Sequence, residues 1–229
     1  MSNNEIYFPK YRINFEANEL RGWKRIFSDR NCRKYPKKSV IVNQGQSVNY
    51  LYFIVKGLIE YTGINEEGTE ELVDVLGDQN LFGLQAIFGN DHSAGFFIAL
   101  EDSIISAISI SELKKYLSTD NNLIKELLGE LSKVTNGLTR QIFEQRLSAE
   151  ERVQETIYCL AEYYVKRGSD CEKQIFIPLS QTELARISRT TRVTVTKVLS
   201  KLKKSKLIHT AYAGLIIYNF NKIKKQKSH

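Results

Sequence analysis

The amino-acid sequence predicts an α+β protein with an N-terminal β barrel or roll, one long helix and a C-terminal winged helix-turn-helix. Three observations lead to this fold class: short β-rich runs separated by glycine, a later change to helical periodicity, and a basic C-terminal quarter. A chain of 229 residues is long enough to bury more than one core. We expect the domains to span residues 1–118, 119–147 and 148–229.

The N-terminal part, between about residues 33 and 110, consists of short runs rich in β-branched and aromatic residues. Runs such as 50–55, 58–62 and 71–76 recur at intervals of roughly 8–12 residues. The segment Asn65-Glu-Glu-Gly68 is typical of a hairpin turn with glycine at a position of positive φ. Short strands at this spacing, with turns of this kind, predict an all-β barrel or roll.

The chain then changes to the periodicity of a helix. From Ile124 to Leu138, apolar residues are separated by 3, 4, 3 and 4 residues, which is the alternation of a coiled-coil seam. Such a helix must bury its seam, either on its own β domain or on the same helix of a second subunit. Because the seam is long and regular, and a symmetric pair satisfies it, we expect a homodimer. The expected interface residues are Ile124, Leu127, Leu131, Val134, Leu138 and Ile142.

The segment 179–202 carries the signals of two short helices joined by a turn. Ser180, followed three residues later by Glu183, forms a capping box for the first helix. Thr191 can cap the second helix. Residues 207–218 then alternate as a hairpin with its turn at 213–214. Together these signals predict a helix-turn-helix followed by a wing.

Positive charge is concentrated at the C-terminal end of the chain. Residues 174–229 contain twelve Lys and Arg residues and a single acid, Glu183, for a net charge of +11. The whole chain carries +7, so the remaining residues carry −4. This uneven distribution of charge predicts that the C-terminal module binds a polyanion and that the rest of the chain has another function.

The second helix of the basic module is expected to point its N-terminal end at base edges in the major groove of double-stranded DNA. Arg192 is the best candidate for a guanine, through O6 and N7, or for a phosphate. Val193 suits a thymine methyl group, whereas the lysines and Ser180 suit phosphates. The predicted DNA-binding residues are Ser180, Gln181, Thr190, Thr191, Arg192, Val193, Thr194, Thr196, Lys197 and Lys201.

Other functions find little support in the composition. No apolar run approaches the roughly 20 residues that cross a bilayer and the N-terminus is polar, so we expect a cytoplasmic protein with no membrane partner. Cys32, Cys159 and Cys171 are too scattered for a zinc or iron–sulfur site, and we expect no metal and no cofactor. No catalytic arrangement is recognisable, so we expect no enzyme activity. Redox control through Cys32 or Cys171 stays open as an alternative.

The order of these parts resembles that of the Crp/Fnr family of bacterial transcription regulators. The matching residues are Gly45, Gly57, Gly68, Gly83, the segment 99–102, Arg152 and the segment 179–202. The resemblance implies that the β part is a double-stranded β-helix like a cyclic-nucleotide-binding domain. It also implies a homodimer on a two-fold-symmetric operator, an effector in the roll, and RNA polymerase as a partner.

The sequence departs from the family pattern in two places. Cyclic-nucleotide-binding members usually carry Gly-Glu-Leu and then an Arg-Ser/Thr pair, where this chain has Gly83-Leu-Gln85 and Ser93-Ala94. Without that arginine and carboxylate we do not expect cyclic AMP to bind. The family's frequent Glu-x-x-Ser-Arg reader is Val193-x-x-Thr196-Lys197 here. Since glutamate accepts from cytosine N4 and valine does not, we expect an A·T-rich palindrome.

The apolar and aromatic character of the roll suits an uncharged or weakly acidic organic effector. The expected effector-binding residues are Leu76, Phe82, Gly83, Leu84, Gln85, Ser93, Ala94, Leu131, Thr135 and Leu138. The alternative is that these residues form only the core of a vestigial sensor. The protein would then be a constitutive regulator.

Overall fold

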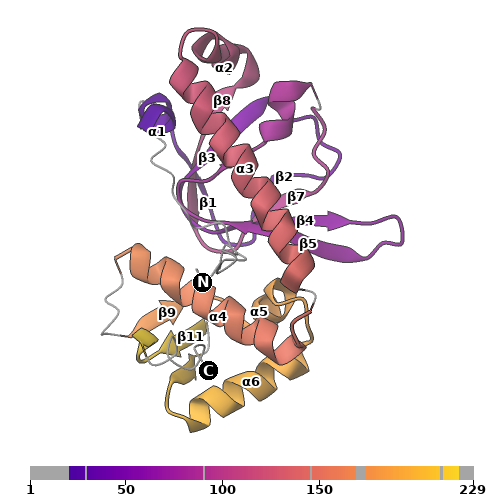
Figure 1. Cartoon of the computed structure of the whole chain (residues 1–229), viewed down its shortest axis with the longest axis vertical. Helices are drawn as coiled ribbons and strands as arrows, with labels where there is room; N and C mark the ends of the chain where they lie inside the picture. Colours follow the sequence, from indigo (N-terminus) through magenta and orange to yellow (C-terminus); the bar gives the residue numbers. More distant parts are fainter. Residues whose placement is uncertain are drawn as a thin grey trace, which may run out of the picture.

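The computed structural model describes residues 21–28, 30–89, 91–144, 146–168, 174–211 and 214–221. Figure 1 shows a β-roll at the top, the long helix α3 running along it, and a smaller domain below. We call the described residues between 33 and 109 the roll, and those between 148 and 221 the head. None of the described helices is both long and apolar enough to cross a membrane.

The roll consists of two four-stranded antiparallel sheets, in agreement with the predicted all-β roll. The strand order is β1-β8-β3-β6 in one sheet and β2-β7-β4-β5 in the other. The strands are β1 (Arg33–Tyr35), β2 (Val40–Val42), β3 (Tyr50–Lys56), β4 (Ile59–Ile64), β5 (Glu70–Leu76), β6 (Leu81–Phe82), β7 (Phe96–Ala99) and β8 (Ser103–Ser109).

A ladder of four stacked aromatic rings lies in the core between the two sheets, among aliphatic residues such as Ile54 and Ile59. Phe82 stacks on Tyr52 with ring centroids 4.7 Å apart and on Phe97 at 4.6 Å. Phe97 in turn stacks on Tyr61 at 4.6 Å. Tyr52 and Phe82 come from the first sheet, whereas Phe97 and Tyr61 come from the second. The Phe82–Phe97 pair therefore joins the two sheets, and the other two pairs join neighbouring strands within one sheet. Each stacked pair adds roughly 0.5–1.5 kcal/mol to the burial of the rings themselves.

The predicted hairpin turn joins β4 to β5. Gly68 has a φ of +78°, which glycine adopts without steric cost. The Asn65 carboxamide oxygen accepts hydrogen bonds from the backbone N–H groups of Glu67 and Thr69, at 3.0 and 2.9 Å. The two residues that predict the turn from the sequence, Asn65 and Gly68, are thus the residues that form it.

Four helical segments flank the roll: α1 (Arg21–Ser28), the 3₁₀ helix η1 (Leu84–Phe88), α2 (Ile110–Leu117) and α3 (Asn121–Glu144). Helix α1, which was not predicted from the sequence, packs on α3. The Glu126 carboxylate accepts from the backbone N–H groups of Gly22 and Trp23, at 3.1 and 3.3 Å. Trp23 is fully buried, in one cluster with Leu127.

This packing corrects the predicted seam of α3. Leu127 is only 4% exposed because it lies in the core of its own chain, so it is not available to a second subunit. Its neighbour Leu128 is 60% exposed. The exposed stripe of α3 therefore contains Ile124, Leu128, the half-buried Leu131, Thr135, Leu138 and Ile142, with spacings of 4, 3, 4, 3 and 4. The predicted Val134, which is 39% exposed, lies beside this stripe.

The head is a three-helix unit with a small sheet of order β10-β11-β9. The elements are α4 (Ala149–Lys166), β9 (Ile175–Ile177), α5 (Gln181–Ile187), α6 (Arg192–Lys204), β10 (Ile208–Ala211) and β11 (Gly214–Ile217). The predicted wing is the hairpin of β10 and β11, and Ala213 of its turn lies outside the described residues. Cys171 also lies outside them.

The head and the roll share one continuous core. The roll residues Leu58, Leu72, Val75 and Leu100 belong to the same apolar cluster as the buried residues of α4, α5 and α6. A polar cluster at the end of α4 adds to this contact.

In that polar cluster the Arg167 guanidinium binds Asp78 at 3.0 Å and also Glu101. The Tyr163 hydroxyl donates to the Gly57 carbonyl oxygen at 2.8 Å, and the Tyr164 hydroxyl donates to Glu101 at 2.7 Å. Apolar and polar contacts together dock the head on its own roll.

Candidate nucleic-acid interface

The two helices of the helix-turn-helix begin at the predicted caps. The Ser180 hydroxyl accepts from the backbone N–H of Glu183, whose carboxylate accepts from the backbone N–H of Ser180, so the capping box is complete. The Thr191 hydroxyl accepts from the backbone N–H of Thr194 at 3.3 Å. These local hydrogen bonds fix where α5 and α6 start.

Arg152 of α4 holds the turn between the two helices. Its guanidinium donates to the carbonyl oxygens of Ser188 at 3.1 Å, Arg189 at 2.9 Å and Leu147 at 2.8 Å. Arg189 has a φ of +48°, a conformation that non-glycine residues seldom adopt, and the turn depends on it. Arg152 is therefore a positioning residue for α6.

The recognition helix α6 buries one face and exposes the other. Val195, Val198, Leu199 and Leu202 are buried in the head. Val193 is an apolar residue whose side chain is 78% exposed, which is unusual for a large apolar side chain in a folded domain. The other exposed members of the predicted DNA-binding set are Ser180, Thr191, Arg192, Thr196, Lys197 and Lys201, and the half-buried members are Gln181, Thr190 and Thr194.

A hydrogen bond ties the first turn of α5 to α6. The Thr196 hydroxyl donates to Gln181 Oε1, with the two oxygens 2.8 Å apart. With its oxygen engaged in this way, the carboxamide of Gln181 has its two N–H donors left for another acceptor. Base edges and phosphates are acceptors of this kind.

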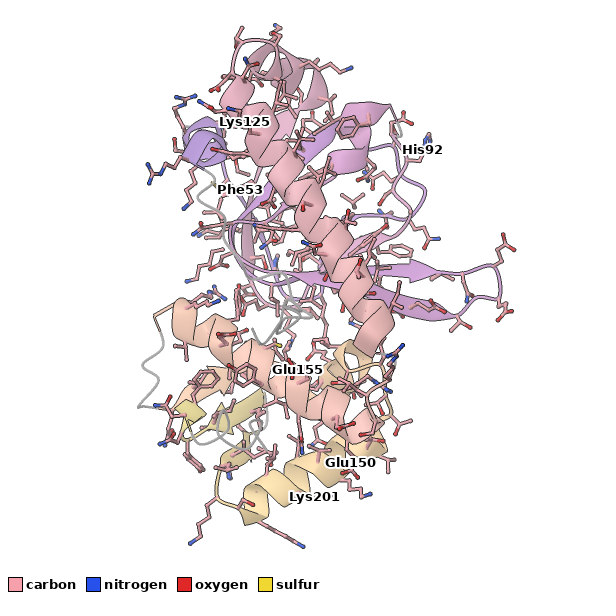
Figure 2. The ribbon with its side chains drawn as sticks, viewed as in Figure 1. Phe53, His92, Lys125, Glu150, Glu155 and Lys201 are labelled. Atoms are coloured by element: carbon pink, nitrogen blue, oxygen red, sulfur yellow. The ribbon has the colours of Figure 1, made fainter. Side chains whose placement is uncertain are left out.

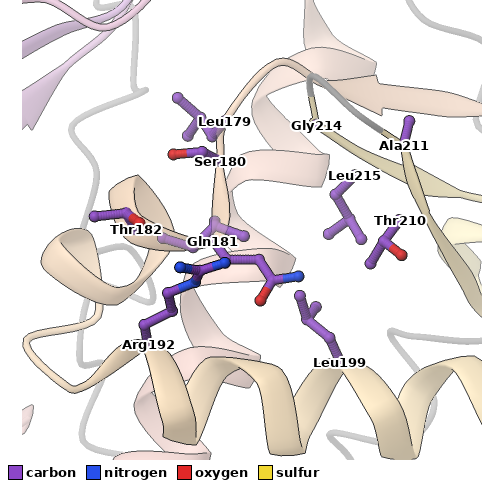
Figure 3. Close-up of a pocket in the computed structure, with 11 residues that line it drawn as sticks. Leu179, Ser180, Gln181, Thr182, Arg192, Leu199, Thr210, Ala211, Gly214 and Leu215 are labelled. Carbon is purple, nitrogen blue, oxygen red and sulfur yellow. The ribbon is translucent and has the colours of Figure 1, made fainter.

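A hollow of about 240 Å³ separates the start of α5 from α6 and the wing. Figure 3 shows Arg192 and Gln181 reaching into it from the two helices, with Thr210 and Ala211 on the wing side. Leu184, Leu199 and Leu215 form its apolar floor. The hollow lies between the two elements that a winged helix-turn-helix uses on nucleic acid.

Two further contacts of α6 were not apparent from the sequence. Lys197 and Lys201 both pair with the carboxylate of Glu150, at 2.7 and 2.5 Å. Figure 2 shows Glu150 and Lys201 side by side where the first turn of α4 meets α6. Nothing in the sequence pattern pairs residues about fifty positions apart, so this acid could be found only in the structure.

The predicted effector-binding residues fall into three groups. Leu76, Phe82 and Ser93 are buried, and Phe82 is part of the aromatic ladder. Gly83, with a φ of +85°, precedes η1, and a Cβ atom there would lie 2.8 Å from the Tyr50 carbonyl oxygen. The remaining ones lie near the surface, half-buried or exposed: Leu84, Gln85, Ala94, Leu131, Thr135 and Leu138.

Comparison with known protein families supports both halves of this architecture. Residues 32–120 match the cyclic nucleotide-binding domain, and residues 151–225 match the Crp-like helix-turn-helix domain. The chain belongs to the Crp/Fnr family of transcription regulators.

Individual Crp/Fnr proteins are similar to this chain at low identity. The cAMP-activated global transcriptional regulator CRP of Haemophilus influenzae is 22% identical over 190 residues, which cover 82% of this chain and 84% of the relative. The cAMP-activated regulator Vfr of Pseudomonas aeruginosa is 22% identical over 205 residues, with coverage of 87% and 95%.

Solved structures show the same fold. FixK2 from Bradyrhizobium japonicum has a TM-score of 0.71 at 19% identity and covers 86% of this chain and 96% of its own. The regulator CLP of Xanthomonas campestris, described as c-di-GMP responsive, has a TM-score of 0.69 at 21% identity, with coverage of 88% and 100%. At these identities the likeness concerns the fold alone.

In this Crp/Fnr regulator, part of the head's positive charge faces the roll. Arg186 of α5 pairs with the buried carboxylate of Glu60 and, at 3.2 Å, with Glu70. Arg189 donates to the Leu72 carbonyl oxygen at 2.9 Å. Lys37 of the roll pairs with Glu183 at 2.9 Å. The net charge of +11 of residues 174–229 thus overstates the positive charge that this segment can offer to a polyanion.

The Glu60–Arg186 pair gives the head–roll contact a pH dependence. Burial raises the pKa of the Glu60 carboxyl, and Arg186 partly offsets this rise. In an Arg186→Ala variant the carboxyl would be buried without its main partner. We expect the free energy of unfolding at neutral pH to fall by about 2 kcal/mol, less than for a fully buried pair because Arg186 is partly exposed.

This loss should grow as the pH rises. A carboxyl whose pKa is raised in the folded state binds more protons when folded, so stability falls as pH increases through that pKa. Urea unfolding of the Arg186→Ala variant from pH 5 to 8 measures the effect. Arg192→Ala, which removes an exposed arginine from the same head, should change stability by no more than about 0.5 kcal/mol. A loss independent of pH would contradict this assignment.

Proposed function

We propose that this chain is an effector-responsive transcription regulator that binds an A·T-rich palindromic operator as a homodimer in the cytoplasm. The observation that carries the proposal is the outward face of α6, which presents Arg192, Val193 and Thr196 on a helix fixed by caps and by Arg152. In a winged helix-turn-helix this face meets base edges in the major groove. As in the resemblance that the sequence suggested, RNA polymerase is the proposed protein partner.

In the proposed complex, Arg192 contacts a guanine or a phosphate, and Val193 contacts a thymine methyl group. At 78% exposure, Val193 has no packing role in the head that would account for an apolar residue there. Ser180, Lys197 and Lys201 contact phosphates, which set the register without reading sequence. The half-buried Gln181, fixed by Thr196, adds donors at the edge of the hollow.

Substitution of Arg192 tests base reading. Arg192→Ala should weaken binding to a palindrome obtained by site selection by about 5- to 150-fold, the equivalent of one bidentate base contact of about 1–3 kcal/mol. Binding to a random duplex should change by less than about threefold, since a single phosphate contact accounts for little of it. Fluorescence anisotropy on both duplexes measures the ratio. Equal losses on the two duplexes would show that Arg192 contacts only the backbone.

The proposed dimer is formed by the exposed stripe of α3. Leu128 at 60%, Leu138 at 48% and Ile142 at 64% exposure leave an apolar surface along the helix. The alternating spacing of 4 and 3 residues along the whole stripe places its members on one side of α3, where the same helix of a second subunit can cover them. Two recognition helices about 34 Å apart would then meet successive major grooves.

A double substitution in this stripe tests the dimer. Leu128→Asp with Leu138→Asp places four carboxylates in the proposed interface, so we expect a monomer at micromolar concentration in sedimentation experiments. Affinity for the palindrome should fall to that for a half-site. Asn136→Asp is the matched control, because Asn136 is exposed on another side of α3. A double variant that stays dimeric would place the interface elsewhere.

The proposed effector is a small, uncharged or weakly acidic organic molecule. The residues proposed to bind it at the mouth of the roll toward α3 are the accessible members of the expected set, among them Leu84, Gln85, Leu131 and Thr135. An effector there would change the packing of α3 and so the separation of the two heads. The docking of the head on the roll gives a second route by which the roll can influence α6.

One observation favours a second candidate function, that of a constitutive regulator. The aromatic ladder occupies the interior of the roll with the chain's own side chains, and Phe82 is 2% exposed. A roll filled in this way needs no ligand for its stability.

Thermal unfolding with candidate ligands distinguishes an effector-responsive regulator from a constitutive one. A ligand that binds the folded state at 100 times its Kd stabilises the protein by about 2.7 kcal/mol, which is several degrees in Tm for a domain of this size. We expect such a shift with a small organic acid and none with cyclic AMP. Full operator affinity of the ligand-free protein, with no shift from any compound or metabolite extract, would favour the constitutive regulator.

A further inference from the structure

Glu150 lies in the first turn of α4 and faces the recognition helix. Its Oε1 is 2.7 Å from Lys197 Nζ, and its Oε2 is 2.5 Å from Lys201 Nζ. The two lysines are four residues apart on α6, so they project from the same side of that helix. One carboxylate thus accepts hydrogen bonds from two ammonium groups, one on each oxygen.

This arrangement occurs at the surface. The Lys197 and Lys201 side chains are 65% and 57% exposed, and Glu150 is 32% exposed. A phosphate can therefore reach either lysine from solvent. A phosphate between these two lysines would bring two negatively charged oxygens to the same two ammonium groups. The Glu150 carboxylate already makes those contacts within the protein.

The carboxylate keeps its charge over the physiological range. Hydrogen bonds from Lys197 and then Lys201 lower the pKa of Glu150 to about 2. Glu150 therefore opposes the charge of these lysines at every pH at which the protein is expected to work.

We propose that Glu150 competes with the DNA backbone for Lys197 and Lys201, and so limits the affinity of the head for DNA and sets its salt dependence. The proposal rests on the proposed DNA-binding function. A phosphate that approaches either lysine must displace a carboxylate of the same sign or lie beside it. In DNA binding, the three side chains then act as one net positive charge in place of two.

The competitor role differs from a positioning role, in which Glu150 would hold the lysines in the orientation that DNA needs. The two roles predict opposite results when the charge is removed while the shape is kept. Loss of a competitor strengthens binding, whereas loss of a positioning group weakens it.

The test is the salt dependence of binding by Glu150→Gln, measured on a random-sequence duplex between 50 and 200 mM salt. One additional cation available to phosphate steepens the slope of log K against log salt by about 0.9. We therefore expect tighter binding of the variant at 50 mM salt, by roughly three- to tenfold. Its affinity should then fall about threefold more than that of the parent over this salt range.

Glu151→Gln is the matched control. It makes the same change in net charge one residue away, but the Glu151 carboxylate accepts from the backbone N–H of Ser148 at 2.7 Å, as part of a helix cap. We expect less than about a twofold change in affinity and an unchanged slope. A second control places Glu150→Gln in a Lys197→Gln, Lys201→Gln background, where it should have no effect.

Three results would overturn the proposal: weaker binding by Glu150→Gln, an unchanged slope, or an equal gain with Glu151→Gln. If the parent binds DNA and any of these is found, the proposed function stands and only the role of Glu150 is wrong. If neither the parent nor Glu150→Gln binds any duplex at 50 mM salt, the proposed function fails and this inference fails with it.

Discussion

The apolar contact between the head and its own roll determines where the recognition helix lies. Leu58, Leu72, Val75 and Leu100 of the roll share one core with α4, α5 and α6. Tilting the head would expose this core to water, at a cost of about 25 cal/mol for each Å² of apolar surface. The Arg167 and Arg186 ion pairs would be broken as well. In the described residues, α6 is therefore fixed relative to the roll, and through the roll to α3.

This constraint bears on how the proposed dimer would switch. If each roll and head move as one body, the distance between the two recognition helices depends mainly on how the α3 stripes pack. A small rotation of one α3 on the other would then carry a whole subunit with it, and the displacement would be largest at α6, which lies beyond the end of α3 (Figure 1). An effector that acts at the mouth of the roll, close to Leu131 and Thr135, would lie beside this pivot.

The charges of the head are divided among three tasks. Arg152 serves the turn, Arg186 and Arg189 bind the roll, and Lys197 and Lys201 share one carboxylate. A count of basic residues in the sequence cannot distinguish these tasks, because each depends on a partner distant in the chain. Arg192, whose side chain reaches the hollow between α6 and the wing, differs from them in its position.

Local features could be predicted from the sequence, and features that depend on distant partners could not. Ser180 and Thr191 cap their helices as predicted, because a cap involves only residues two or three positions away. The heptad pattern located α3 correctly but placed Leu127 in the wrong environment. Which side of α3 its own chain covers depends on Trp23 and α1. The i, i+3, i+4 spacing of Trp23, Ile26 and Phe27 is typical of a helix, but so short a segment does not reveal which helix it covers.

The environment of the expected effector-binding residues could not be predicted from the sequence either, because it depends on residues distant in the chain. The family pattern drew attention to Gly83, but it did not predict the 3₁₀ helix η1 that follows, and Phe82 proved to be part of a ring ladder between two sheets. An aromatic residue in the core and one in a ligand pocket look alike in a sequence. Glu60 could not be matched with Arg186 either, because 126 residues separate them.

In the proposed complex, two copies of α6 bind one duplex at adjacent turns of its major groove. A hydroxyl-radical footprint of the full-length protein, on a palindromic duplex obtained by site selection, measures this directly. Binding by two copies of α6 should give two equivalent protected patches, centred about 10 base pairs apart and related by the symmetry of the site. A single patch, or uniform weak protection at protein concentrations that saturate the duplex, would contradict it.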